Sequence, residues 1–221
     1  MELEQQILTQ NECYQEKRPL KPKGVMVHST GVAQPDPMVF VRRWNGPDVQ
    51  KCVHAFVGKF ADGEPGTVQT LPWTHRGWHA GGAANNTHIG FEICEDGLDD
   101  PVYFQKIYEE SVQLTAMLCQ QFKLDPLAEG VVICHAEGHQ LGIASQHVDV
   151  LHWFPKQGKS MDDFRQDVAA RLREDPEPEE PEEEGGDGGV TYEQWKEFME
   201  RYRQELAQLP SLDWGQEELE K

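Results

Sequence analysis

The chain has 221 residues, and its 39 acidic and 20 basic side chains give a formal net charge of −19. This length fits one domain of about 100–150 residues together with an appendage. Because binding to nucleic acid requires clustered lysine and arginine, the charge excludes nucleic acid as a partner. The apolar fraction of 38% is enough for a core. No apolar run approaches the roughly 18 residues of a membrane span, so no membrane insertion is expected.

The acidic residues are distributed unevenly. Residues 1–173 carry a net charge of −6, residues 174–189 carry −9, and residues 190–221 carry −4. The middle segment is rich in proline, glutamate and glycine and cannot bury apolar area, which predicts an extended acidic linker. The last segment has apolar residues at helical spacing after Thr191, which predicts a short helical appendage. We therefore expect one domain over residues 1–173.

The cysteines and the N-terminus bear on the cellular compartment. The five cysteines are scattered without a CxxC pair, so neither a disulfide framework nor an all-cysteine zinc site is expected. The N-terminus carries Glu2 and Glu4 and has no apolar h-region, so it does not resemble a secretory signal.

Apolar runs and their periodicity predict strands that alternate with helices. In chain order, the predicted elements are a helix over residues 5–14, strands over Gly24–Val27, Val53–Val57, Thr67–Leu71 and Ile89–Cys94, a helix over residues 102–123 and a strand over Val131–Cys134. The second helix has the clearest amphipathic stripe in the chain. This order predicts an α/β fold with a central sheet.

Three apolar strands carry a polar residue that a core would not select. His28 follows Gly24–Val27, His135 follows Val131–Cys134, and Glu92 lies between Phe91 and Ile93. Side chains converge at strand ends in α/β folds, where ligands and metals bind. A buried carboxylate is costly without a charged partner, and a nearby cation would remove that cost. These residues predict a metal site.

The segment after His135 offers further metal ligands. His135 and His139 have the spacing of an HExxH motif, but the glutamate is at position 137 and Gly138 disfavours a helix. A better set takes two histidines at strand ends and a third ligand from the following loop, either His147 or Asp149. Catalytic zinc needs three such ligands and an open position for water.

Taken together, five segments resemble the zinc-dependent N-acetylmuramoyl-L-alanine amidases, a family that includes phage endolysin-like enzymes and relatives of the peptidoglycan recognition proteins. The resemblance covers about residues 20–172. It rests on these segments, in the order of the family: GVMVHST, QTLPWTHRGWHAGG, NNTHIGFEICED, VVICHAEGH, and HVDVLHWFP followed by GKSMDDFRQDV. The resemblance implies a mixed sheet flanked by helices, with a zinc groove on one face.

The resemblance also implies a set of zinc ligands, namely His28, His135 and Asp149. The chain departs from the family pattern at two positions. Val150 stands where relatives carry proline after the third ligand, and His147 stands where relatives often carry a catalytic lysine. These departures leave His147 open as a second candidate for the third ligand, and Asp149 is favoured.

The same resemblance implies hydrolysis of the amide between N-acetylmuramic acid and L-alanine in peptidoglycan. Glu92 would act as the general base, and His147 would stabilise the oxyanion. The loop before Glu92 supplies the substrate-binding candidates Trp78, His79 and Asn86. Two other functions compete with this one: a peptidoglycan-binding module without activity, and a metallopeptidase acting on stem peptides.

The substrate lies outside the membrane, whereas no secretory signal is expected. We therefore expect cytoplasmic synthesis followed by release to the cell wall, as for a phage or prophage lysin. The appendage over residues 190–221 resembles the start of a cell-wall-binding module.

Overall fold

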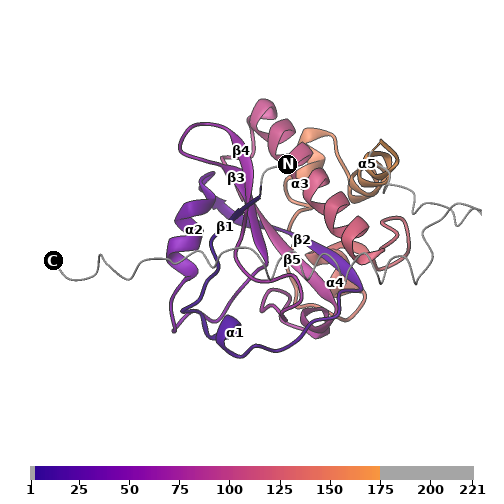
Figure 1. Ribbon diagram of the computed structural model, residues 1–221. Coiled ribbons are helices and arrows are strands. Elements are labelled where there is room, and N and C mark those ends of the chain that lie inside the picture. The colour runs from indigo at the N-terminus through magenta and orange to yellow at the C-terminus, as the bar shows by residue number, and fades with distance from the viewer. Residues whose placement is uncertain (1–2, 175–221) are drawn as a thin grey trace, which may run out of the picture. The chain divides into compact units, whose positions relative to one another are not determined.

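The computed structural model describes residues 3–174, which form a six-stranded sheet with helices on both sides (Figure 1). The strand order across the sheet is β1-β4-β3-β5-β2-β6; β3 and β4 pair antiparallel, and the other neighbours pair parallel. The strands are β1 (Leu3–Gln5), β2 (Gly24–Ala33), β3 (Ala55–Lys59), β4 (Pro65–Gln69), β5 (His88–Glu95) and β6 (Val132–Cys134). This mixed α/β sheet confirms the predicted fold class. The predicted linker, apart from Glu174, and the predicted appendage lie outside the described residues.

The helices begin where local sequence signals place them. They are α1 (Glu12–Gln15), α2 (Pro37–Trp44), α3 (Pro101–Phe122), α4 (His135–Gln140) and α5 (Met161–Glu174), with 3-10 turns at Ala83–Asn86 and Phe154–Gln157. The Asp36 and Asp100 side chains cap α2 and α3, and a proline follows each cap. None of the helices in residues 3–174 combines the length and the apolarity needed to cross a bilayer.

Alternation along β2 and β5 separates two faces of the sheet. Val25 and Val27 on β2, and Phe91 on β5, pack in the apolar cluster that contains the buried side chains of α3 and α5. His28 and Glu92, one residue further along, therefore face the other way. Figure 1 shows α3 and α5 on one side of the sheet and α2 on the other. The polar residues predicted to bind a metal thus lie on the face opposite to α3.

Two predicted boundaries are wrong. Residues 5–14 do not form one helix, because the chain pairs with β4 as strand β1 and continues this pairing through Leu8, whose N–H donates to the Thr70 carbonyl. A helix begins only after Asn11, which accepts from the Cys13 N–H. Strand β2 does not end before His28 but runs on to Ala33, so this histidine lies inside a strand.

Residues 135–140 form helix α4 despite Gly138. An added Cβ at this glycine would lie only 2.7 Å from Met26 Cε, so the missing side chain lets the helix pack closely on β2. Tertiary packing therefore outweighs the low helix propensity of glycine.

All five cysteines are buried, and none forms a disulfide.

Candidate metal centre and active site

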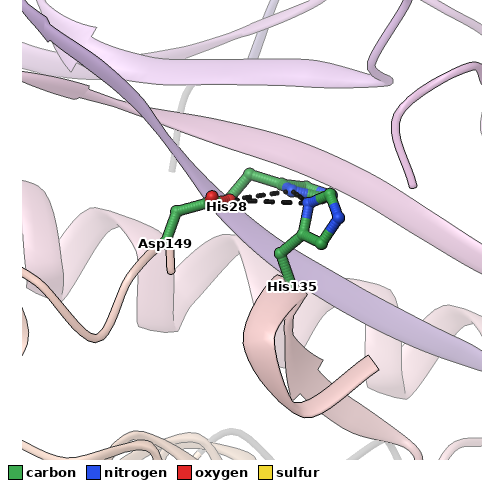
Figure 2. A group of neighbouring side chains, drawn as sticks. All are labelled: His28, His135 and Asp149. Atoms are coloured by element: carbon green, nitrogen blue, oxygen red, sulfur yellow. Dashed lines mark hydrogen bonds and ion pairs between the residues drawn. The ribbon is translucent and has the colours of Figure 1, made fainter. Parts of the chain in front are cut away.

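Three side chains from distant parts of the chain converge on the face opposite to α3. Figure 2 shows His28 from β2, His135 from the start of α4 and Asp149 from the following loop pointing toward one another. The His28 Nδ1 atom lies 3.1 Å from both Asp149 Oδ2 and His135 Nδ1, and His135 Nδ1 lies 3.7 Å from Asp149 Oδ2. All three ligand atoms lie within 4.8 Å of one another. Two imidazoles and one carboxylate form a donor set that suits zinc.

The surroundings hold His135 and Asp149 in the forms that bind metal. Burial is the main cause that lowers the pKa of His135 to about 4, and the charge of His28 acts in the same direction. Burial alone would raise the pKa of Asp149, but the hydrogen bond from His28 and the charges of both histidines outweigh it and lower this pKa. At neutral pH the site therefore offers a neutral His135 and an ionised Asp149.

Glu92 lies beside the centre on the neighbouring strand. It is the ladder partner of His28 between β5 and β2, so both side chains leave the sheet on the same face. Its Oε2 atom is buried and has no hydrogen-bond partner among the described residues. Burial raises the pKa of Glu92 to about 7, with His28 opposing the shift and Asp149 adding to it. A carboxyl group that titrates near neutrality is suited to accept and return a proton.

His147 lies at the solvent side of the centre. Its side chain is 61% exposed, and its Nδ1 is 3.9 Å from Asp149 Oδ1. Its ring centroid is 4.6 Å from that of His135. The structure thus brings Asp149 into the group of three donors and leaves His147 at the edge of that group. His139, the other histidine of α4, is exposed and lies against the Ala144 carbonyl.

The three substrate-binding candidates occupy different surroundings. Trp78 is partly buried against the apolar cluster under α2. Asn86 is exposed, and its Oδ1 accepts from Arg76 Nε at 2.7 Å. Of the three, His79 makes the contact with the metal centre, because its Nδ1 lies 2.9 Å from His28 Nε2. Burial lowers the pKa of His79 well below its usual value, and the charges of His28 and His54 add to this effect.

The loop that carries Asp149 is attached at three further points that the sequence interpretation missed. His152 Nε2 lies 3.0 Å from Glu95 Oε1, and Glu95 is buried at the end of β5. Ser145 Oγ lies 3.2 Å from His135 Nε2. Trp153, next along the loop, is buried in the cluster under α3. A serine and a glutamate without a motif give no sequence signal for these contacts.

Comparison with known proteins places these residues in a family. The family model of N-acetylmuramoyl-L-alanine amidase matches residues 18–156. A search of curated proteins found no match.

Solved structures share the fold. The chain is similar to the Staphylococcus aureus hydrolase AmiA in complex with its ligand, with a TM-score of 0.65 and 18% identity over 79% of this chain and 86% of that chain. It is also similar to the catalytic domain of XlyA, with a TM-score of 0.59 and 23% identity over 76% and 99% of the two chains. For a mutant endolysin from Bacillus subtilis the TM-score is 0.56, with 22% identity over 76% and 99%. Since the family model covers more than half of the sequence, the chain belongs to the N-acetylmuramoyl-L-alanine amidase family.

Proposed function

We propose that this protein is a zinc-dependent hydrolase that cleaves the amide between the lactyl group of N-acetylmuramic acid and L-alanine in peptidoglycan. The observation that carries the proposal is the convergence of His28, His135 and Asp149 within 4.8 Å, next to the unpartnered carboxylate oxygen of Glu92. Membership of the amidase family supports the substrate and the bond.

The residues fit a zinc ion. Two imidazole nitrogens and one carboxylate oxygen match the three-ligand sets of catalytic zinc, which leave a further position for water. His28 and His135 are only 2% and 4% exposed, whereas His147 at the edge of the site is 61% exposed. The donors are therefore shielded on the protein side, and substrate would approach from the side of His147.

When bound there, zinc would supply Lewis acidity, which activates a water and polarises the amide carbonyl. Glu92 would take a proton from the attacking water at Oε2 and deliver it to the nitrogen of the leaving alanine. His147, when protonated, would stabilise the negative charge that develops on the carbonyl oxygen. The C–N bond breaks, and one water is consumed. The glycan keeps a lactyl carboxylate, and the stem peptide gains a free amino group.

Digestion of purified peptidoglycan, with and without a chelator, tests this proposal. We expect new N-terminal alanine, no new reducing sugars, and loss of the reaction in chelator that added zinc restores. New reducing ends would identify a glycosidase instead. Cleavage within the stem peptide would identify a metallopeptidase, and binding without any new end would identify a binding module.

A pair of histidine variants from the same helix controls the metal assignment. His135→Ala should lose stoichiometric zinc and all activity, whereas His139→Ala should keep both, because only His135 lies among the three donors. Equal zinc content in the two variants would contradict the proposed centre.

Because the substrate lies outside the cytoplasm, release in the manner of a lysin stays a prediction, to be checked by localisation during growth and lysis.

A further inference from the structure

Each histidine of the metal centre uses both of its ring nitrogens. The Nδ1 atoms of His28 and His135 face Asp149 and each other, as described above. Their Nε2 atoms face away from the centre, toward His79 and Ser145 respectively. A neutral imidazole carries its proton on only one nitrogen, so these outer contacts decide which nitrogen remains free to bind a metal.

The contact beyond His28 can be followed to a backbone carbonyl. His79 Nε2 lies 3.1 Å from the His88 carbonyl oxygen, which can only accept, so this nitrogen carries the hydrogen. Among the described residues no ion pair joins a carboxylate to this ring, so no contact favours a second hydrogen on it. Its Nδ1 then holds a lone pair and accepts from His28 Nε2 at 2.9 Å. His28 therefore carries a hydrogen on Nε2. The hydrogen that its Nδ1 donates to Asp149 is the one that a metal ion would replace.

The contact beyond His135 follows the same logic. The Ser145 hydroxyl lies 3.2 Å from the Ala80 carbonyl oxygen, to which it can only donate. Its oxygen then accepts from His135 Nε2, also at 3.2 Å. His135 therefore carries its hydrogen on Nε2 as well, and its Nδ1 lone pair faces the centre.

Both paths pass through the neighbouring residues His79 and Ala80, whose backbone is held in place. The Asn85 Oδ1 atom accepts from both backbone N–H groups, at 2.9 and 2.8 Å. The Ser145 N–H donates to the Ala80 carbonyl at 2.8 Å. One asparagine side chain thus fixes the segment from which both outer contacts are made.

Glycines make room for the two outer side chains. A Cβ on Gly90 of β5 would lie 2.4 Å from the His79 ring, and one on Gly77 would lie 2.8 Å from the same ring. A Cβ on Gly81 would lie 2.6 Å from Ser145 Oγ. The His79 ring therefore occupies a slot between glycines, from which it reaches both His28 and the His88 carbonyl.

We propose that His79 and Ser145 are positioning residues that hold His28 and His135 in the Nε2–H tautomer, so that both present Nδ1 to the metal. The inference rests on the proposed function only for the identity of the ion. It assigns His79 a role behind the metal ligand rather than in substrate binding.

Matched variants at position 79 separate hydrogen bonding from shape. His79→Leu fills the slot but offers no acceptor, whereas His79→Asn places an amide oxygen near the former Nδ1. We expect zinc affinity, measured by competition with a chromophoric chelator, to fall about 10–100-fold in His79→Leu and in Ser145→Ala. His79→Asn should stay within a few-fold of the wild type. Thermal melting of each zinc-free variant shows whether it is folded.

Nitrogen-15 NMR of the imidazoles in the zinc-free wild-type protein supplies a measurement that needs neither zinc nor activity. We expect hydrogen on Nε2 of His79, His28 and His135. Hydrogen on Nδ1 of His79 would overturn the proposal, as would unchanged zinc affinity in His79→Leu and Ser145→Ala or an equal loss in His79→Leu and His79→Asn. A protein that shows the expected tautomers and zinc affinities but cleaves no peptidoglycan would contradict the proposed function and leave this inference intact.

Discussion

The two faces of the central sheet are made by the same strands but differ in chemistry. On β5, Phe91 enters the apolar core beneath α3, while Glu92 enters the candidate active site. On β2, Val27 and His28 divide in the same way. The core face holds side chains whose removal leaves a cavity. The site face holds polar groups that contact one another, together with the unpartnered Oε2 atom of Glu92. Substitutions on the core face should therefore lower stability, whereas substitutions on the site face should lower activity.

The largest effect is expected on activity from Glu92→Gln. The amide cannot accept the proton of the attacking water, so turnover should fall about 10²–10⁴-fold. Zinc content should remain, because Glu92 is not among the three converging donors. Release of N-terminal alanine from peptidoglycan and metal analysis measure the two quantities. A fully active variant would show that another group is the base.

Phe91→Ala tests the opposite face, one residue away. Phe91 is completely buried, and its loss should lower the free energy of unfolding by about 3–5 kcal/mol. Denaturant unfolding of the zinc-free protein measures this change. Under conditions where the variant is folded, its zinc stoichiometry should match that of the wild type. A change below about 1 kcal/mol would contradict the separation of the two faces.

Glu92 should also make the stability of the zinc-free protein depend on pH. Its pKa is raised from 4.5 to about 7 by burial, so the folded state holds its proton more tightly than the unfolded state. The resulting stabilisation is complete below pH 4.5 and is lost as the pH rises through 7. At pH 8, Glu92→Gln should exceed the wild type by about 1–3 kcal/mol, a range that allows for partial contact with solvent. A constant difference between pH 4 and 8 would contradict the raised pKa.

The smallest effect is expected from His152→Ala. Loss of the contact with Glu95 should lower stability by only about 1 kcal/mol, because His152 remains 27% exposed. The same change removes one attachment of the loop that carries Asp149, so the free energy of zinc binding should be weakened by more than the free energy of unfolding. The exposed His139 provides the control, since His139→Ala should change neither quantity. Chemical unfolding and chelator competition make the comparison.

The sequence correctly predicts the elements whose structure follows from the local pattern of apolar residues. Apolar runs predict β5 and β6, and the amphipathic stripe predicts α3. In each of these segments only one type of secondary structure buries the apolar side chains. The helix over residues 5–14 is wrong because pairing with β4 competes with it. Helices α2 and α5 were not predicted, although α2 follows an Asp-Pro start signal and α5 begins at a reciprocal bond between Ser160 and Asp163.

The candidate site was likewise predictable from the sequence only in part. Polar residues among apolar strands indicated His28, Glu92 and His135. The following loop offered His147 or Asp149 as the third ligand, and the family resemblance favoured Asp149. The contacts behind them join residues far apart in the chain, such as His152 and Glu95, which are 57 positions apart. No local pattern encodes such a pair. The role of Gly77 and Gly90 could not be predicted either, because it depends on the His79 ring lying against β5 in the folded protein.

Regular elements carry two of the three ligands, His28 inside β2 and His135 on the first turn of α4. Strand and helix backbone fix the direction of these two side chains, so loading the centre should need little loss of conformational entropy beyond the loop that holds Asp149. Unlike small zinc modules that unfold when stripped, this domain should keep its structure without metal. Recovery from a chelator should then proceed at the rate of metal exchange rather than of refolding, which makes the centre reloadable.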